Sequence, residues 1–289
     1  MTTQKDGSTR RAALAIGAGG LAAMTASAPR TASAAAPDLS DPKDFLTTVV
    51  KMRGATDGSV AMGWITGQRY AIVDGRAIPM FGLLASTFFT YTRLDELTFE
   101  MRSFEVAYFT DLVTGKLLER WENPITGKII DEIPQTRMGP SVVPVKPGGF
   151  DLTAVPSMAN LDANHLFRPA VTQGDDIWIT EEIKIAGDAP APGVPPFRYN
   201  EMTTYNAKLS DLAKPGLATV PTSIQYQSFV GMSPWLGMEG IDAMNMGRGS
   251  GRRATRVEEM PAYYLELTEK YHPDVLNDPM SVLHGPRHN

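Results

Sequence analysis

Residues 59–92 read SVAMGWITGQRYAIVDGRAIPMFGLLASTFFTYT, and this stretch decides the fold. Large β-branched and aromatic residues recur in it at every second position, which is the period of a strand whose two faces differ. Asp74-Gly75 interrupts the pattern with a dipeptide that suits a tight hairpin turn, because both turn residues need a positive φ. The stretch therefore predicts two antiparallel strands, at about 59–73 and 78–92.

The same alternation continues along the chain. Further strands are predicted at about 97–110, 116–122, 128–133, 176–185, 198–209 and 219–230. Residues 138–156 and 187–196 are rich in proline and glycine and are predicted to be long surface loops. Successive hairpins predict a mainly β fold, an antiparallel meander that closes into a calycin-like (lipocalin-like) barrel, because closure removes exposed edges. A sandwich of two sheets is the alternative.

One helix is predicted on each side of the strands. Asp41 is a favourable N-cap and is followed by Pro42, which suits the first helical position, while Gly54 ends the helical spacing of apolar residues. Near the other end of the chain, residues 261–271 place tyrosines and leucines largely on one side and predict a closing helix.

The first residues of the chain have the order of an export signal. Arg10 and Arg11 precede the small, weakly apolar run 12–28, which contains no acidic residue. The arginine pair favours the twin-arginine route, and an ordinary secretory signal is the alternative. We expect residues 1–36 to be cleaved and residues 37–289 to form one β-rich domain, with a short disordered C-terminal tail that includes His284, in the periplasm or outside the cell.

Composition narrows the chemistry. The chain has no cysteine, which excludes disulfides, thiolate nucleophiles and cysteine-ligated zinc. Its net charge of −5 disfavours nucleic acid as a partner. The histidines have no metal-ligand spacing and the serines form no nucleophile elbow, so we expect no metal and no cofactor. The expected partners are a small-molecule ligand or substrate and the twin-arginine export machinery, with no membrane insertion after cleavage.

Several sequence motifs occur in an order that resembles one protein family. They are Lys51-Met52-Arg53-Gly54, Gly63-Trp64-Ile65-Thr66-Gly67, Trp121-Glu122-Asn123-Pro124-Ile125-Thr126-Gly127, Gly174-Asp175-Asp176-Ile177-Trp178 and Pro234-Trp235-Leu236-Gly237-Met238. From about Asp41 to Pro273 the chain resembles the bacterial and fungal domain-of-unknown-function family 1838. The resemblance implies one exported domain and no particular activity or catalytic residue.

Ionisable residues occur on strand faces that are otherwise apolar. Residues 176–185 place Glu181 in a row of isoleucines, residues 97–110 place Glu105 among apolar and small side chains, and Arg69 shares a face with Ile65. These three residues are therefore predicted to point inward.

An inward carboxylate must be paired, hydrogen-bonded or protonated, and a protonated one with a raised pKa is a useful general acid or base. The predicted catalytic group is Glu181 and Glu105 with Tyr205 as proton donor, Tyr108 being the alternative donor, and Arg69 polarising an oxygen. The competing interpretations are a structural ion pair between Arg69 and a glutamate, and a strand shifted by one residue so that its glutamate faces water.

Aromatic residues offer a candidate ligand pocket. Its predicted lining is Trp64, Tyr70, Tyr108, Trp178, Trp235 and Met238, and plain core packing is the alternative for all six. Residues 246–253 are glycine-rich and basic but lack a phosphate-loop context, so a flexible turn is predicted there. His165 is a further catalytic candidate between loops.

The sequence thus predicts an exported, cofactor-independent enzyme that performs acid–base chemistry on a small hydrophobic molecule, as a lyase, isomerase or hydrolase. A non-catalytic ligand-binding barrel is the main alternative. A structural partner in a cell-surface complex is the third hypothesis.

Overall fold

The structure is a computed structural model that describes residues 36–158, 160–188 and 196–286. The predicted export signal lies outside the described residues, apart from Ala36. Among the described helices none is long and apolar enough to cross a lipid bilayer.

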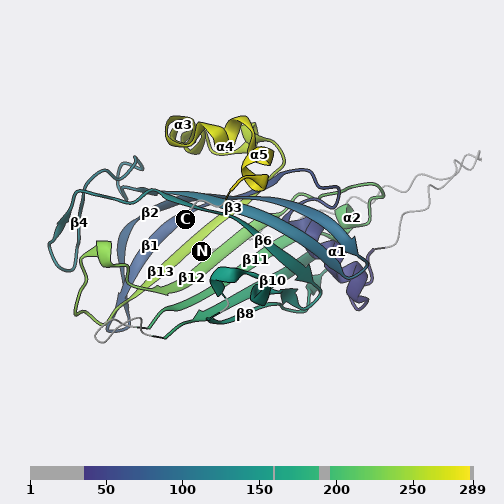
Figure 1. Ribbon diagram of the computed structural model, residues 1–289, viewed down its shortest axis with the longest axis horizontal. Coiled ribbons are helices and arrows are strands. Elements are labelled where there is room, and N and C mark those ends of the chain that lie inside the picture. The colour runs from purple at the N-terminus through teal and green to yellow at the C-terminus, as the bar shows by residue number, and fades with distance from the viewer. Residues whose placement is uncertain (1–35, 159, 189–195, 287–289) are drawn as a thin grey trace, which may run out of the picture. The chain divides into compact units, whose positions relative to one another are not determined.

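Ten antiparallel strands follow one another around a nearly closed barrel (Figure 1). Their order is β7 (Gly149–Phe150), β6 (Thr136–Lys146), β3 (Thr98–Thr110), β2 (Arg76–Asp95), β1 (Ala61–Val73), β13 (Met244–Ala254), β12 (Ser223–Gly231), β11 (Arg198–Lys208), β10 (Asp176–Ala186) and β8 (Asp162–Phe167). A further strand, β9 (Val171–Gln173), pairs with β10. The predicted mainly β, meander-built barrel is confirmed, and the two-sheet sandwich is wrong.

The barrel closes at a seam between β7 and β8. The N–H of Phe167 donates to the carbonyl oxygen of Gly148 at 3.3 Å, and the Phe150 N–H donates to Nδ1 of His165 at 3.1 Å. A Cβ on Gly149 would lie 2.2 Å from the carbonyl oxygen of His165, so only glycine allows the two edges to come this close. The seam therefore joins the edges with few hydrogen bonds.

The hairpin that opens the barrel forms as the sequence predicts. Asp74 and Gly75 have φ values of 50° and 73°, the left-handed conformation that a tight primed turn requires. The strands on either side pair without interruption from Val73 with Arg76 to Tyr70 with Pro79, and the register shifts before the next pair, Arg69 with Phe81. This shift lies where Arg69 enters the barrel interior.

Residues 246–253 form most of strand β13, so the predicted flexible turn is wrong. β13 pairs with β1 on one side and β12 on the other. A Cβ on Gly251 would lie 1.7 Å from the Trp64 carbonyl oxygen, and one on Gly67 would lie 2.0 Å from that of Arg248. The glycines therefore let two neighbouring strands approach closely and bend, which is one use of glycine inside a sheet.

One loop prediction and two strand predictions also need correction. Residues 138–156 were expected to be a loop, but most of them belong to β6 and β7, followed by the 3-10 helices η1 (Leu152–Ala154) and η2 (Pro156–Met158). β6 accepts prolines because it lies next to the open edge of the sheet. The strands predicted at 116–122 and 128–133 shrink to β4 (Trp121–Glu122) and β5 (Ile129–Ile130), which pair only with each other. β8 and β9 were not predicted.

Helix α1 (Pro42–Arg53) occupies one end of the barrel and begins as predicted (Figure 1). The Asp41 carboxylate accepts hydrogen bonds from the N–H groups of Lys43 and Asp44, and Gly54 caps the other end. Apolar side chains of α1 pack into a core with residues from β2, β3, β6, β8, β10, β11 and β12. One end of the interior is therefore filled by a helix.

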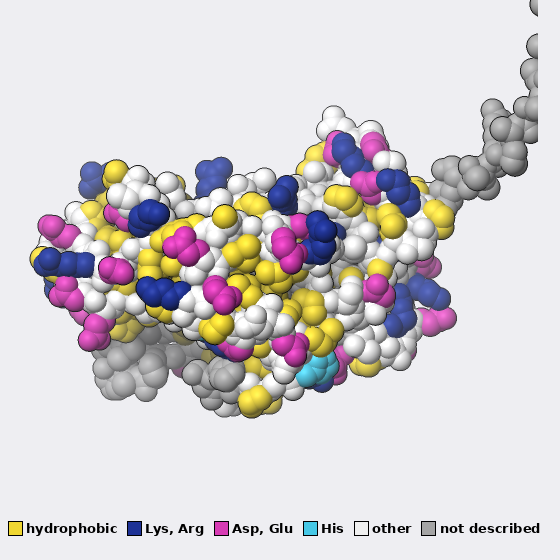
Figure 2. All heavy atoms as spheres, turned by 90° about the horizontal axis from the view of Figure 1, so that it is seen from above, with side chains coloured by type: hydrophobic (Ala, Val, Ile, Leu, Met, Phe, Trp, Pro, Cys, Tyr) yellow, Lys and Arg dark blue, Asp and Glu magenta, His cyan; other side chains and the backbone are white. Residues whose placement is uncertain are grey.

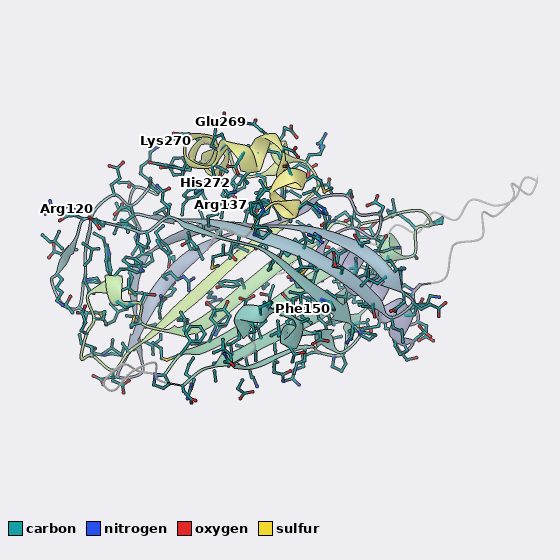
Figure 3. The ribbon with its side chains drawn as sticks, in the orientation of Figure 1. Arg120, Arg137, Phe150, Glu269, Lys270 and His272 are labelled. Carbon is teal, nitrogen blue, oxygen red and sulfur yellow. The ribbon has the colours of Figure 1, made fainter. Side chains whose placement is uncertain are left out.

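The C-terminal helices α3 (Ala262–Tyr271), α4 (Pro273–Asn277) and α5 (Pro279–His284) cover the outer face of β1–β3 (Figure 1). α3 is the predicted closing helix. Leu283 in α5 is fully buried, so the prediction of a disordered tail that includes His284 is wrong. Arg137 of β6 pairs with Asp274 of α4 at 2.7 Å and joins these helices to the barrel (Figure 3).

The short helices α2 (Leu209–Leu212), η3 (Pro234–Leu236) and η4 (Val257–Glu259) lie in connections between these elements. At the end opposite α1, the β4–β5 turns and residues 232–243 form a separate apolar core around Phe81, Trp121 and Trp235. On the face shown in Figure 2, charged side chains of both signs are interspersed with apolar ones.

Candidate functional site

The barrel interior contains a cavity of about 310 Å³ between the α1 end and the middle of the strands. Its apolar wall includes Ile65, Leu83, Ala85, Phe89, Met101, Phe150, Ile183 and Ile224. Its polar wall includes Arg53, Arg69, Ser86, Thr87, Ser103, Glu105, Glu181, Tyr199, Glu201, Thr203, Tyr205 and Tyr226. Met138, which is 53% exposed, marks its rim. The volume lies at the lower end of the range for small-ligand sites.

The four residues predicted to be catalytic all line this cavity. Arg69 comes from β1, Glu105 from β3, Glu181 from β10 and Tyr205 from β11. The alternation of each strand places them inward, as predicted. The competing interpretation, a strand shifted by one residue, does not apply to Glu181, since this residue is only 2% exposed. They nevertheless form two separate clusters instead of one.

The first cluster centres on an ion pair between Glu181 and Arg53, not Arg69. Nε of Arg53 lies 2.9 Å from Oε2 of Glu181, and the two side chains are 6% and 3% exposed. Nη2 donates to Oε1 of Glu181 at 3.3 Å, and the Tyr205 hydroxyl donates to the same oxygen at 2.9 Å. Arg53 comes from the last position of α1, so this pair joins the helix to the barrel wall.

Aromatic side chains surround the Arg53 guanidinium. Its central carbon lies 4.7 Å from the ring centre of Phe150 and 5.0 Å from that of Phe89. Its Nη1 donates to the Tyr91 hydroxyl and its Nε to the Tyr205 hydroxyl at 3.1 Å. Figure 3 labels Phe150, which lies at the seam of the barrel. Cation–π contacts and hydrogen bonds therefore fix the buried arginine in one orientation.

His165 completes the first cluster from β8. Because its Nδ1 accepts a hydrogen bond from the Phe150 N–H, a neutral ring must carry its proton on Nε2. Nε2 lies 3.5 Å from Oε2 of Glu181. Burial alone would raise the pKa of Glu181, but the Arg53 charge and the His165 and Tyr205 contacts outweigh it and lower that pKa. Glu181 is therefore a stably ionised carboxylate.

The second cluster contains Glu105, Glu201 and Arg69. The Tyr199 hydroxyl donates to Oε2 of Glu201, and the Thr203 hydroxyl donates to its Oε1 at 3.0 Å. Arg69 donates from Nη1 to the Ser228 hydroxyl at 3.3 Å. Glu105 and Glu201 are both half-buried, and both line the cavity.

The pKa values of the two carboxyl groups in the second cluster are raised, whereas the pKa of Glu181 is lowered. Burial raises the pKa of Glu201 to about 7, and the charges of Glu181 and Glu105 add to this effect against the opposing Tyr199 hydrogen bond. Burial also raises the pKa of Glu105, although Arg69 opposes the change. A carboxyl group with a pKa near neutrality can both accept and return a proton at physiological pH.

None of the six residues predicted to line a ligand pocket lines this cavity. Trp64 and Tyr108 lie beneath the C-terminal helices, where the Tyr108 hydroxyl donates to Thr268 at 3.2 Å. Trp235 and Met238 belong to the apolar core opposite α1. Tyr70 and Trp178 occupy outward positions of β1 and β10, beside inward Arg69 and Ile177.

Arg53 and Glu201 were not predicted as site residues, although the position of each within its helix or strand indicates an inward side chain. Arg53 lies seven residues after Leu46 and four after Val49, so it continues the apolar face of α1. Glu201 shares a strand face with Tyr205. His165 was assigned to loops and instead lies on β8, within the first cluster.

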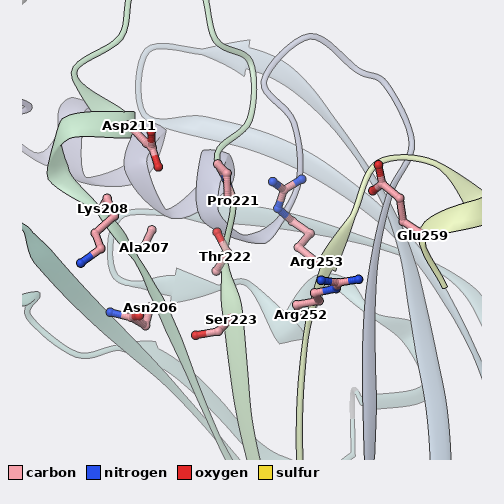
Figure 4. A pocket seen from close by; sticks show the side chains of 10 residues that line it. All are labelled: Asn206, Ala207, Lys208, Asp211, Pro221, Thr222, Ser223, Arg252, Arg253 and Glu259. Atoms are coloured by element: carbon pink, nitrogen blue, oxygen red, sulfur yellow. The ribbon is translucent and has the colours of Figure 1, made fainter. Parts of the chain in front are cut away.

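A second cavity, of about 560 Å³, lies near the ends of β11, β12 and β13 (Figure 4). Three of its five acidic and basic residues form ion pairs with residues close by. Lys208 pairs with Asp176 at 2.8 Å, Asp211 with Lys214 at 2.5 Å and Glu259 with Arg256 at 3.0 Å. The barrel interior is a better candidate for the functional site than this second cavity, because several strands place titratable groups with raised pKa values around it.

Within the described part of the chain, no group of three or more histidine, aspartate or glutamate side chains is arranged to hold a metal ion. Comparison with curated protein sequences finds no match. The profile of a family described as protein of unknown function (DUF1838) matches residues 58–287, which is most of the chain and all of the barrel strands. The chain therefore belongs to this family.

Proposed function

We propose that the barrel interior binds a small, mainly apolar molecule and transfers a proton to or from it without a cofactor. The observation that carries this proposal is Glu201, a cavity carboxyl group whose pKa is raised to about 7 and whose two oxygens are held by Tyr199 and Thr203. A general acid or base works best when its pKa lies near the working pH and its position is fixed.

The other residues of the second cluster supply complementary roles. Glu105 has a raised pKa and faces the same cavity, so it can take the opposite part in a two-carboxyl proton exchange. Arg69 provides a positive charge that stabilises negative charge developing on a ligand oxygen. A proton removed by one carboxyl and returned by the other gives an isomerase, and a proton removed with loss of a leaving group gives a lyase.

In this proposal Glu181 is a positioning residue instead of the proton carrier. Its carboxylate already accepts hydrogen bonds from Tyr205 and Arg53 and has a lowered pKa, so it is a weak base. The Arg53–Glu181 pair holds α1 against the cavity wall. It also places a negative charge that contributes to the raised pKa of Glu201.

The test begins with the titration of Glu201 by carbon NMR of labelled side-chain carboxyl groups. We expect a transition near pH 7 that Glu201→Gln removes. A screen of small apolar carbonyl compounds should then give a ligand that raises the melting temperature, and Glu201→Gln should lose turnover by about 10²-fold or more while still binding it. Equal turnover by this variant and the native protein would reject the assigned role.

A non-catalytic binding barrel is the second candidate function. The aromatic enclosure of Arg53 favours it, because a buried arginine fixed by hydrogen bonds and cation–π contacts makes that part of the wall rigid, which suits ligand retention without chemistry. The same screen separates the two functions, since a carrier binds without converting the ligand. For both functions we propose that the protein works outside the cytoplasm after export, on the basis of Arg10-Arg11 and the run 12–28.

A further inference from the structure

We propose that the ligand of the barrel cavity carries a carboxylate group and that Arg69 binds it. This inference rests on the proposed function, since it names the class of molecule that the same cavity accepts. It follows from the contrast between the two interior arginines and from the space that the barrel leaves around one of them.

Arg69 is held in place but is not neutralised. A guanidinium has five N–H donors, and the hydrogen bond that Arg69 makes to another side chain runs from Nη1 to Ser228 at 3.3 Å. Its Nε is buried without a hydrogen-bond partner, and no carboxylate of the described residues lies within 4.0 Å of it as an ion pair. Arg53, by contrast, has Glu181 at 2.9 Å and two tyrosine hydroxyls. The cavity therefore contains one arginine whose charge is left for a ligand.

A glycine in the neighbouring strand leaves space for the Arg69 guanidinium. Gly247 of β13 lies opposite Arg69 in the sheet. A Cβ at this position would lie 2.8 Å from both Nη1 of Arg69 and the Ser228 hydroxyl. The glycine thus allows the guanidinium to lie against β13 and keeps it at the cavity wall.

The groups that face Arg69 from other elements favour an anion. They are Glu105 on β3, Glu201 and Tyr199 on β11, and Tyr226 and Ser228 on β12. Burial raises the pKa of both glutamates and of both tyrosines. With the pKa of Glu201 at about 7 and those of the tyrosines above their ordinary value, Glu201 is partly protonated and the tyrosine hydroxyls are neutral near pH 7. An incoming carboxylate therefore meets the Arg69 cation together with hydroxyl groups and the protonated fraction of Glu201, which can donate hydrogen bonds to it.

Binding of a carboxylate should therefore be coupled to proton uptake. A negative charge beside Arg69 disfavours ionisation of Glu201, whose pKa is about 7, so each bound anion should draw in up to one proton near that pH. The affinity should fall as the pH rises above 7, because ionised Glu201 repels the ligand. The cavity volume of about 310 Å³ and its isoleucine and phenylalanine wall limit the remainder of the ligand to a small apolar body.

The test uses benzoate as the probe and benzamide as a neutral molecule of the same shape. Calorimetric titration of the full chain at pH 6.5 should show benzoate binding at least about tenfold more tightly than benzamide. Heats measured in two buffers of different ionisation enthalpy should show proton uptake. Arg69→Gln should remove the preference, and Arg69→Lys should retain part of it.

Arg248→Gln is the matched control, because Arg248 is exposed and lies next to Gly247 on the same strand. It should leave both affinities unchanged. Equal binding of the two probes, or unchanged benzoate binding in a folded Arg69→Gln variant, would overturn the carboxylate assignment and leave the cavity as a binding site for neutral molecules. If neither probe binds the native protein, the result counts against the cavity itself and overturns the proposed function as well.

Discussion

The ion pair of Glu181 and Arg53 allows a quantitative test of how the barrel is held together. Glu181→Gln keeps the shape of the side chain but removes its charge, and it leaves the Arg53 guanidinium 6% exposed without a counter-ion. Nothing else among the described residues forms an ion pair with Arg53, and the Tyr91 and Tyr205 hydroxyls supply only dipoles. The variant therefore retains the burial cost of a cation after losing the attraction that offset it.

The expected loss of stability follows from buried ion pairs in general. Breaking one by removing a single partner costs about 3–5 kcal/mol, whereas replacing both partners by apolar side chains is often neutral. Glu181→Gln should thus destabilise the protein by about 3 kcal/mol or more. The double variant Arg53→Met with Glu181→Gln should recover at least half of that loss, because no buried charge remains.

Urea unfolding at pH 7 measures these differences, provided that the m-value stays constant. Glu182→Gln is the matched control, since Glu182 neighbours Glu181 and pairs with Arg168 at 2.7 Å on the outside, where Arg168 is 51% exposed. That substitution should cost less than about 1 kcal/mol. If Glu181→Gln costs no more than Glu182→Gln, the buried pair contributes little and the reasoning fails.

Three further predictions concern export, strand packing and pH. Replacing Arg10 and Arg11 by lysine should retain the precursor in the cytoplasm if the twin-arginine route is used, and fractionation of cells checks this. Gly251→Ala should lower the free energy of unfolding by about 2 kcal/mol or more, because its Cβ would lie 1.7 Å from the Trp64 carbonyl oxygen. The control is Gly231→Ala, whose Cβ would have no atom within 4 Å. It should change the free energy of unfolding by less than about 0.5 kcal/mol in the same urea assay. Glu201→Gln should be more stable than the native protein at pH 8 and nearly equally stable at pH 4.

The sequence was most informative where local chemistry decides the structure. The cap of α1, the Asp74-Gly75 turn and the alternation that points Glu105 and Glu181 inward depend on neighbours within a few residues. These features could be predicted because backbone geometry and side-chain direction follow from short-range rules.

Features that depend on distant partners were missed. The sequence alone predicts that Gly251 belongs to a flexible segment. The position requires glycine because the Trp64 carbonyl of the neighbouring strand β1 lies too close for a Cβ, and this contact depends on the fold. The sequence pattern indicates Arg69 as the possible partner of a glutamate, and only the packing of α1 into the barrel end shows that the partner of Glu181 is Arg53. The six residues predicted to line a ligand pocket have the composition of one, but the barrel divides four of them between two separate cores and places Tyr70 and Trp178 at outward strand positions.

The pH prediction follows from Glu181 and Glu201, two carboxyl groups that line the same cavity and whose pKa values are shifted in opposite directions. The pKa of Glu181 is lowered in the folded protein, so its contribution to stability is present above its ordinary value near 4.5 and is lost as the pH falls below that value. The pKa of Glu201 is raised from 4.5 to about 7, so folding becomes less favourable as the pH rises between those values and the cost stays constant above about 7. Since one pKa unit corresponds to about 1.4 kcal/mol, the rise from 4.5 to about 7 costs on the order of 3 kcal/mol at pH 8. Glu201→Gln removes that cost without changing the loss of stability in acid that comes from Glu181, so its stability curve should diverge from the native one as the pH rises above about 4.5. Two curves that run parallel from pH 5 to 8 would show that Glu201 titrates normally, and its assigned role in proton transfer would lose its basis.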